Sequence, residues 1–276
     1  MCYKTLLVHL DDSPRCAVRL ALALELAGRF DAHLVGLYVP APHARTPSPE
    51  DASAAQERSE RARAQFLDAG ARADRIVEWR APHPGDGTGA TGIADATLHA
   101  RHADLLVLGQ HDSADPAIKI PGDFVTDLLM SAARPAIVVP HSGAFPAFAR
   151  NVLIAWDGSR EAARAASDAL PLLRRADHVS IEVIAPQRGS HPARAEAEAM
   201  DAAAWLDLHG VNASFHESAG ASGLETGAAL LSRASDLRAD LLVAGAYAHA
   251  RIRERVLGGV TRTLLEAMTL PVLMSH

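Results

Sequence analysis

The sequence is poor in cysteine and in aromatic residues, and both shortages restrict what the protein can be. Its 276 residues include only two cysteines, Cys2 and Cys16. Two cysteines imply no disulfide framework, so a reducing cytoplasm is the expected compartment. Aromatic residues make up 4% of the chain. That low share disfavours the stacking platforms with which proteins bind single-stranded nucleic acid.

Long apolar runs and an excess of positive charge are also absent from the sequence. No apolar run approaches the roughly 18 residues of a membrane span, and the chain starts on a strand pattern instead of a signal peptide. The formal net charge of −6 argues against a nucleic acid partner, which would need a basic face. We therefore expect a globular cytoplasmic protein that binds neither nucleic acid nor a membrane.

The most informative feature that is present is an internal repeat. The segment ADLLVLG at residues 103–109 returns as ADLLVAG at residues 239–245, an offset of 136. Asp11 and Ser13 return as Asp157 and Ser159, an offset of 146. A ten-residue deletion in the second copy accounts for the difference. Each copy has the length of an ordinary domain, so we predict one domain over residues 1–148 and a second over residues 149–276.

Short apolar runs alternate with segments of helical period in both copies. Runs such as residues 105–108 are apolar at every position, which is typical of parallel strands covered on both faces. The expected strands are residues 6–10, 33–39, 75–80, 105–109 and 136–140 in the first half, and 152–156, 179–184, 213–216, 241–245 and 272–275 in the second. Strands that alternate with helices predict two tandem doubly wound α/β domains, each with a five-stranded parallel sheet flanked by helices.

A candidate ligand site lies in the second half, beyond the carboxyl ends of two predicted strands. Ligands of open parallel sheets bind there, where the winding direction reverses. Asp157 follows the first strand and could accept a hydrogen bond from a ribose hydroxyl. Gly258 and Gly259 precede a helix, so backbone N–H groups could approach an anion at its N-terminus. Thr261 adds a hydroxyl donor, and four arginines surround this loop: Arg251, Arg253, Arg255 and Arg262.

These residues resemble the universal stress protein family in its tandem-domain form. Nucleotide-binding members of that family carry G-x2-G-x9-G-[ST] after the fourth strand and an aspartate after the first. In this sequence the motif positions are Gly245, Ala248, Gly258, Gly259, Val260 and Thr261, with Ala248 in place of the second glycine and Gly259 in place of the usual Ser or Thr. The resemblance further implies that Asp157 meets the ribose, that the backbone of Val183 meets the adenine, and that Ala155 lies beside it.

The first half departs further from the motif. It has Gly109-x2-Asp112-x9-Gly122-Asp123, so two carboxylates stand where a polyphosphate would lie. Like charges a few ångströms apart in a partly dry site cost of the order of several kcal/mol. We therefore expect that the first half does not bind ATP in the manner of the family.

The resemblance implies a stress-response regulatory protein that binds ATP or a related adenine nucleotide in its C-terminal half, with or without Mg²⁺. We find no acid–base pair or nucleophile arranged for turnover, so slow ATP hydrolysis is the most catalysis expected. One alternative is an interaction or structural module of the same fold that binds no nucleotide. Another is an adenylating α/β enzyme, although Asp157-Gly158-Ser159 lacks the leading glycines of its pyrophosphate loop. The family resemblance also implies that the two halves pair as a pseudo-dimer, and two chains could associate as a homodimer.

Other signals have simpler interpretations. The literal GxGxxG at residues 87–92 follows the third strand instead of the first, so we interpret it as a loop. His99 and His102 stand at i, i+3 without a third ligand at suitable spacing, so no metal site is expected. Ser13 and Ser159 are expected to be helix N-caps instead of nucleophiles.

Overall fold

The computed structural model describes residues 2–11, 13–39, 49–81, 92–112, 122–184, 192–218, 223–246 and 259–276. The chain divides into two compact units, a first half of residues 2–141 and a second half of residues 142–276. The domain boundary at residues 148/149 stays a prediction. Among the described residues, no helix combines the length and the apolar character that crossing a bilayer requires.

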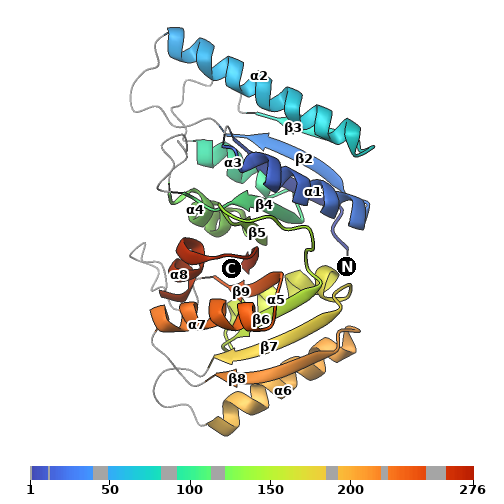
Figure 1. The fold of residues 1–276 in the computed structure, drawn as a ribbon, viewed down its shortest axis with the longest axis vertical. Helices are drawn as coiled ribbons and strands as arrows, with labels where there is room; N and C mark the ends of the chain where they lie inside the picture. Colours follow the sequence, from blue (N-terminus) through green and yellow to red (C-terminus); the bar gives the residue numbers. More distant parts are fainter. Residues whose placement is uncertain are drawn as a thin grey trace. The chain divides into compact units, whose positions relative to one another are not determined.

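The first half is a parallel sheet with helices on both faces (Figure 1). Its strands are β1 (Thr5–Leu10), β2 (His33–Tyr38), β3 (Val77–Arg80), β4 (Leu105–Gly109) and β5 (Ala136–Val139). Its helices are α1 (Cys16–Phe30), α2 (Pro49–Arg72), α3 (Gly92–Ala100) and α4 (Phe124–Ala132). The strand order is β3-β2-β1-β4-β5, and neighbouring strands pair in parallel.

The second half repeats this arrangement. Its strands are β6 (Asn151–Trp156), β7 (His178–Ile184), β8 (Ala213–Ser218), β9 (Leu241–Gly245) and β10 (Val272–Ser275). Its helices are α5 (Arg160–Leu173), α6 (Pro192–Leu208), α7 (Gly223–Asp236) and α8 (Gly259–Ala267). The strand order is β10-β9-β6-β7-β8, again with parallel pairs. The predicted fold class, two doubly wound domains with five-stranded parallel sheets, is confirmed.

The winding direction reverses beside the first strand of each half. In the first half, α1 and α2 connect strands that step away from β4, whereas α3 and α4 connect strands that step the other way. Right-handed crossovers then place α1 and α2 on one face and α3 and α4 on the opposite face. The reversal lies between β1 and β4 in the first half, and between β6 and β9 in the second. These are the places where open α/β sheets bind ligands.

The central strands and the helices against them form the core of each half. The four residues of β4 that precede Gly109 are buried completely, as the uninterrupted apolar run predicts. The apolar face of α4 also packs into this core, since Val125, Leu128, Leu129 and Ala132 are all buried. In the second half, Leu264 of α8 and Met268 just after it are buried, whereas Val260 is half-buried.

The two serines that were expected to cap helices behave differently. Ser159 is the N-cap of α5, because its Oγ accepts a hydrogen bond from the N–H of Ala162 at 3.1 Å. The same expectation for Ser13 is wrong, since α1 begins only at Cys16. The hydroxyl of Ser13 instead donates to Asp11 Oδ1 at 2.6 Å. The Asp11 carboxylate is charged, and a hydrogen bond to a charged acceptor is stronger than the neutral bond that the hydroxyl would accept from a helix N–H.

Candidate functional site

The second half brings the ends of three neighbouring strands to one edge of its sheet. Trp156, the last residue of β6, pairs with Val183 of β7. Ile154 pairs with Val243 of β9, so Gly245 lies level with Trp156. Of the residues predicted for the nucleotide site, Ala155, Asp157, Val183 and Gly245 therefore share this edge.

The predicted phosphate loop is described only at its end. Gly259, Val260 and Thr261 form the first turn of α8, and Thr261 is buried. Ala248 and Gly258 lie outside the described residues, together with Arg251, Arg253 and Arg255. Arg262 is exposed, and its Nε donates to Glu266 Oε1 at 2.8 Å along the same helix.

Asp157 keeps an oxygen available at the edge of the sheet. Its Oδ1 accepts the backbone N–H of Ser159 at 3.0 Å, a turn that Gly158 makes possible with a φ of +74°. Next to it, Nε1 of Trp156 is buried and has no hydrogen-bond partner among the described residues. Sequence reasoning missed Trp156. The signal was a tryptophan at a strand end, because a buried indole N–H needs an acceptor.

Gly245 is required by packing, independently of any ligand. A Cβ at this position would lie 2.6 Å from the backbone nitrogen of Ala162 and 2.6 Å from the carbonyl carbon of Glu161. The first turn of α5 therefore packs directly on the end of β9. This close approach of helix to strand fixes the geometry of the edge on which Asp157 stands.

The corresponding crevice of the first half is filled by a buried arginine, Arg19. Arg19 of α1 is buried; its Nε donates to the carbonyl oxygen of His9 at 2.6 Å, and its Nη2 lies 3.0 Å from Asp11 Oδ1. The guanidinium packs on Gly109, where any Cβ would overlap it. Asp11, the counterpart of Asp157, is therefore held by Arg19 and Ser13.

The charges of this cluster shift each other's pKa. Burial, and after it the positive charge of Arg19, lower the pKa of His9 to about 3 against the opposing effect of Asp11. Burial alone would raise the pKa of Asp11. However, the positive charge of Arg19, with help from His9 and Ser13, holds it below its ordinary value. At neutral pH the cluster therefore contains a neutral imidazole beside a buried ion pair.

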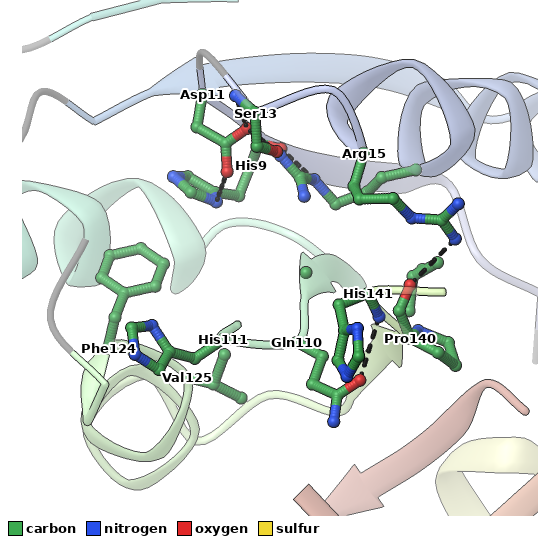
Figure 2. Close-up of a pocket in the computed structure, with 13 residues that line it drawn as sticks. His9, Asp11, Ser13, Arg15, Gln110, His111, Phe124, Val125, Pro140 and His141 are labelled. Atoms are coloured by element: carbon green, nitrogen blue, oxygen red, sulfur yellow. Dashed lines mark hydrogen bonds and ion pairs between the residues drawn. The ribbon is translucent and has the colours of Figure 1, made fainter. Parts of the chain in front are cut away.

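A small cavity adjoins this cluster. Arg15 lies at its rim and donates from Nη2 to the carbonyl oxygen of Pro140 at 3.0 Å, as Figure 2 shows. Opposite, Gln110 Oε1 accepts the backbone N–H of His141 at 2.9 Å. The ring of Phe124 is tilted against that of His9, with their centroids 4.7 Å apart. The cavity has a volume of about 30 Å³, far below the several hundred Å³ of a typical nucleotide-sized pocket.

Of the remaining candidates of the sequence, Asp112 borders this cavity through His141, and the others lie outside it. Asp112 Oδ2 lies 3.8 Å from Nδ1 of His141, and Asp123 is exposed just before α4. Nδ1 of His99 lies 3.5 Å from Arg80, whereas Nδ1 of His102 faces the carbonyl oxygen of Leu98. Most of the GxGxxG segment lies outside the described residues.

Comparisons with known proteins agree with this architecture. The chain is similar to a universal stress protein from Archaeoglobus fulgidus DSM 4304, with a TM-score of 0.76, 16% identity and coverage of 98% of this chain and 97% of that one. A putative universal stress protein from Pseudomonas aeruginosa UCBPP-PA14 gives a TM-score of 0.61, 20% identity and coverage of 99% and 93%. At these identities the likeness shows the fold alone. No match was found among curated proteins.

The sequence itself also matches a family model. The model of the universal stress protein family covers residues 2–140, the whole first sheet with β1 to β5 and the helices between them. The resemblance noted in the sequence is thereby confirmed, and the chain belongs to the universal stress protein family.

Proposed function

We propose that this stress-response family member binds ATP or a related adenine nucleotide at the edge of its second half. Binding with a regulatory readout is favoured over catalysis, because the described residues of this edge include no acid–base pair arranged for turnover. The cytoplasmic location and the association of the two halves as a pseudo-dimer stay predictions.

The observation that carries the proposal is the exchange of side chains between the two crevices. At the offset of 146, His9 corresponds to Ala155 and Arg19 to Ala165. Both alanines are buried, on β6 and α5 respectively. The two large side chains that fill the first crevice are therefore each reduced to a methyl group in the second. The aspartate is kept as Asp157, whereas the arginine that neutralises its counterpart in the first half is replaced.

The electrostatics of Asp157 support a ribose partner. Among the described residues its carboxylate accepts one hydrogen bond, from the backbone of Ser159, and forms no ion pair. A carboxylate in this state can accept from a sugar hydroxyl, in a charge-assisted bond that is stronger than a neutral one. In the first half Arg19 and Ser13 already hold Asp11, so it is much less available for that task.

The first turn of α8 supports a phosphate partner. A helix begins with backbone N–H groups that have no acceptor within the helix, and its dipole favours an anion there. Gly259, at this position, presents no side chain to a ligand. Mg²⁺ would accompany a polyphosphate bound by these groups, and the resemblance to nucleotide-binding members points to the same loop.

Equilibrium binding of labelled ATP to the full chain tests the proposal. We expect Asp157→Asn to weaken binding by about tenfold or more, since hydrogen bonds to charged groups contribute roughly 1.5–3 kcal/mol. Asp112→Asn, a matched change at the motif loop of the first half, should leave the affinity unchanged. Absence of ATP binding by the unaltered chain would instead favour an interaction module without nucleotide. Equal loss in both variants would contradict the assignment to the second half.

A further inference from the structure

A groove lies between helices α1 and α2 of the first half, and the nucleotide proposal does not use it. Its volume is about 880 Å³, within the range of about 300–1,000 Å³ that is usual for ligand pockets. The lining extends from Leu10, at the end of β1, to Ala73, just after α2. All the residues that line this α1–α2 groove belong to the first half, so the groove is a property of that half alone.

The floor of the α1–α2 groove contains an aromatic ring that packs on a glycine. Phe66 of α2 is buried completely, and a Cβ at Gly36 of β2 would lie 2.7 Å from its Cζ atom. Gly36 has no side chain, so the ring can lie this close to the strand. Gly36 pairs with Val8. At the same register in the second half, Ile181 pairs with Ile154 and is buried. The second half therefore has a branched side chain at the position where the first half accommodates the ring.

The walls of the groove are small and apolar. Leu20 and Leu24 contribute apolar surface from α1. Between Arg61 and Arg72, a stretch that the structure describes in full, Gln65 is the one polar side chain that lines the groove. This lining favours a hydrocarbon chain over an extended peptide, which carries a donor and an acceptor in nearly every residue. Alanines leave the space between the helices open at five positions: Ala17, Ala21, Ala62, Ala69 and Ala73.

Positive charge is in excess around the groove. Asp11 is the one acid that lines it, and Arg19 already holds that carboxylate. Nη2 of Arg72 lies 2.7 Å from Asp68 Oδ2, so this arginine is paired as well. Arg61 is exposed and forms no ion pair with a described residue. Its guanidinium is therefore available to the anionic group of a ligand. The charged residues of the lining are Asp11, Arg58, Arg61 and Arg72.

We propose that the α1–α2 groove binds one long-chain fatty acid, with its carboxylate on Arg61 and its alkyl chain over Phe66 toward Arg72. The helix advances about 16 Å between these two arginines, at 1.5 Å per residue. An extended alkyl chain advances about 1.3 Å per carbon, given its C–C bond length, so about fourteen carbons cover this distance. The site is independent of the nucleotide site proposed for the second half, and it gives the first half a ligand of its own.

Titration calorimetry of the full chain with fatty acids, each below the concentration at which it forms micelles, tests the proposal. We expect saturable binding of one molecule. The affinity should rise by about fourfold for every two carbons from decanoate to tetradecanoate, because each added CH₂ group is removed from water. It should rise no further beyond about fourteen carbons, where the groove ends. An affinity that does not depend on chain length, or no saturable binding at all, would overturn the site.

Arg61→Gln tests the position of the carboxylate. It should weaken dodecanoate binding by about three- to fivefold, the effect of an exposed ion pair. Binding of 1-dodecanol should not change, since the alcohol carries no charge. Arg63→Gln, which removes an exposed arginine of the same helix outside the groove, is the matched control and should bind dodecanoate normally. Equal losses for the acid and the alcohol in Arg61→Gln would overturn the assignment of Arg61.

A tryptophan in the groove tests the position of the alkyl chain. Ala21 is exposed and lines the groove, so Ala21→Trp should fold normally and weaken dodecanoate binding by about tenfold or more. Ala64→Trp, at an exposed position of α2 outside the groove, should bind as the unaltered chain does. Thermal unfolding of both variants verifies that they fold. Unchanged binding in Ala21→Trp would overturn the site, as would binding to phosphatidylglycerol vesicles without binding of monomeric fatty acid.

Discussion

The two halves of this chain have the same sheet topology but different side chains at the carboxyl edge of the sheet. In the first half Arg19 fills the crevice and holds Asp11, whereas the second half has Ala165 in the position of that arginine. The difference extends to the glycine at the end of the fourth strand: Gly109 packs on a guanidinium, and Gly245 packs on the backbone of a helix. A duplicated fold can therefore preserve an edge while one substitution in a helix decides whether a buried arginine fills it.

Removal of Arg19 is expected to have the largest effect on the difference between the two halves, through the stability of the first. Arg19→Met leaves Asp11 as a buried charge without its partner and opens space on Gly109. We expect a loss of about 3–5 kcal/mol in the free energy of unfolding of the first half. Hydrogen exchange resolved by peptide measures this for each half separately.

The control is a double-mutant cycle on the same pair. Asp11→Asn combined with Arg19→Met removes both charges, and it should be less destabilising than Arg19→Met alone. If the two single changes were additive, the ion pair would not be what holds the first crevice together.

The next largest effect is expected from acid, which should destabilise the first half more than the second. The pKa of His9 is about 3 in the folded state and 6.5 in its ordinary state. Between these values the unfolded chain carries a proton that the folded chain does not, so the free energy of unfolding of the first half falls as the pH is lowered. We expect roughly 1 kcal/mol per pH unit below about pH 6, measured by hydrogen exchange at two pH values.

His9→Gln is the matched variant for this pH dependence. It cannot be protonated, so its first half should lose much less stability between about pH 6 and pH 4. Ala155 stands at the same position in the second half and provides no such titration there. An unchanged slope in His9→Gln would assign the acid sensitivity to other groups.

The two strand-end glycines should respond unequally to a methyl group. At Gly245 the added Cβ meets the backbone of Glu161 and Ala162, so α5 must move as a whole. At Gly109 it meets only the end of the Arg19 side chain. We expect Gly245→Ala to cost about 1–3 kcal/mol and Gly109→Ala less, measured by denaturant unfolding. A larger loss at Gly109 would mean that the Arg19 guanidinium is more rigid than the helix.

The fold followed almost entirely from the sequence, because period and repetition are local signals. Apolar runs predicted the strands, and the two offsets predicted their pairing into equivalent sheets, which the structure has as expected. The position of Asp157, Val183 and Gly245 at one edge also followed, since parallel strands end together. None of these features depends on contacts between side chains of different elements.

The arginine in the first crevice could not be predicted, because its position depends on contacts between side chains of different elements. Arg19 lies on the apolar stripe of α1, with Ala23, Leu26 and Phe30 at intervals of one to three turns. A charged residue on a buried stripe signals a partner elsewhere, and here that partner is Asp11. Asp112 and Asp123 led to the prediction that the first half does not bind ATP. Arg19 gives that prediction a second reason, and it lies in α1, outside the loop motif.

The smallest expected effect concerns the two serines, which share one turn and differ in their hydroxyls. In both halves the serine N–H donates to Oδ1 of the aspartate two residues before it, Asp11 or Asp157, at 3.0 Å. Only Ser159 caps a helix, so Ser159→Ala should cost about 1 kcal/mol, and Ser159→Asp, which restores a cap, should restore most of it. Ser13→Asp should not be tolerated in the same way, since it places a second carboxylate beside Asp11. Thermal unfolding of the four single variants at Ser13 and Ser159, to Ala and to Asp, compares them directly. If Ser13→Asp were as stable as Ser159→Asp, Ser13 would have to act as a cap in solution, and the distinction between the two crevices would be smaller than their side chains indicate.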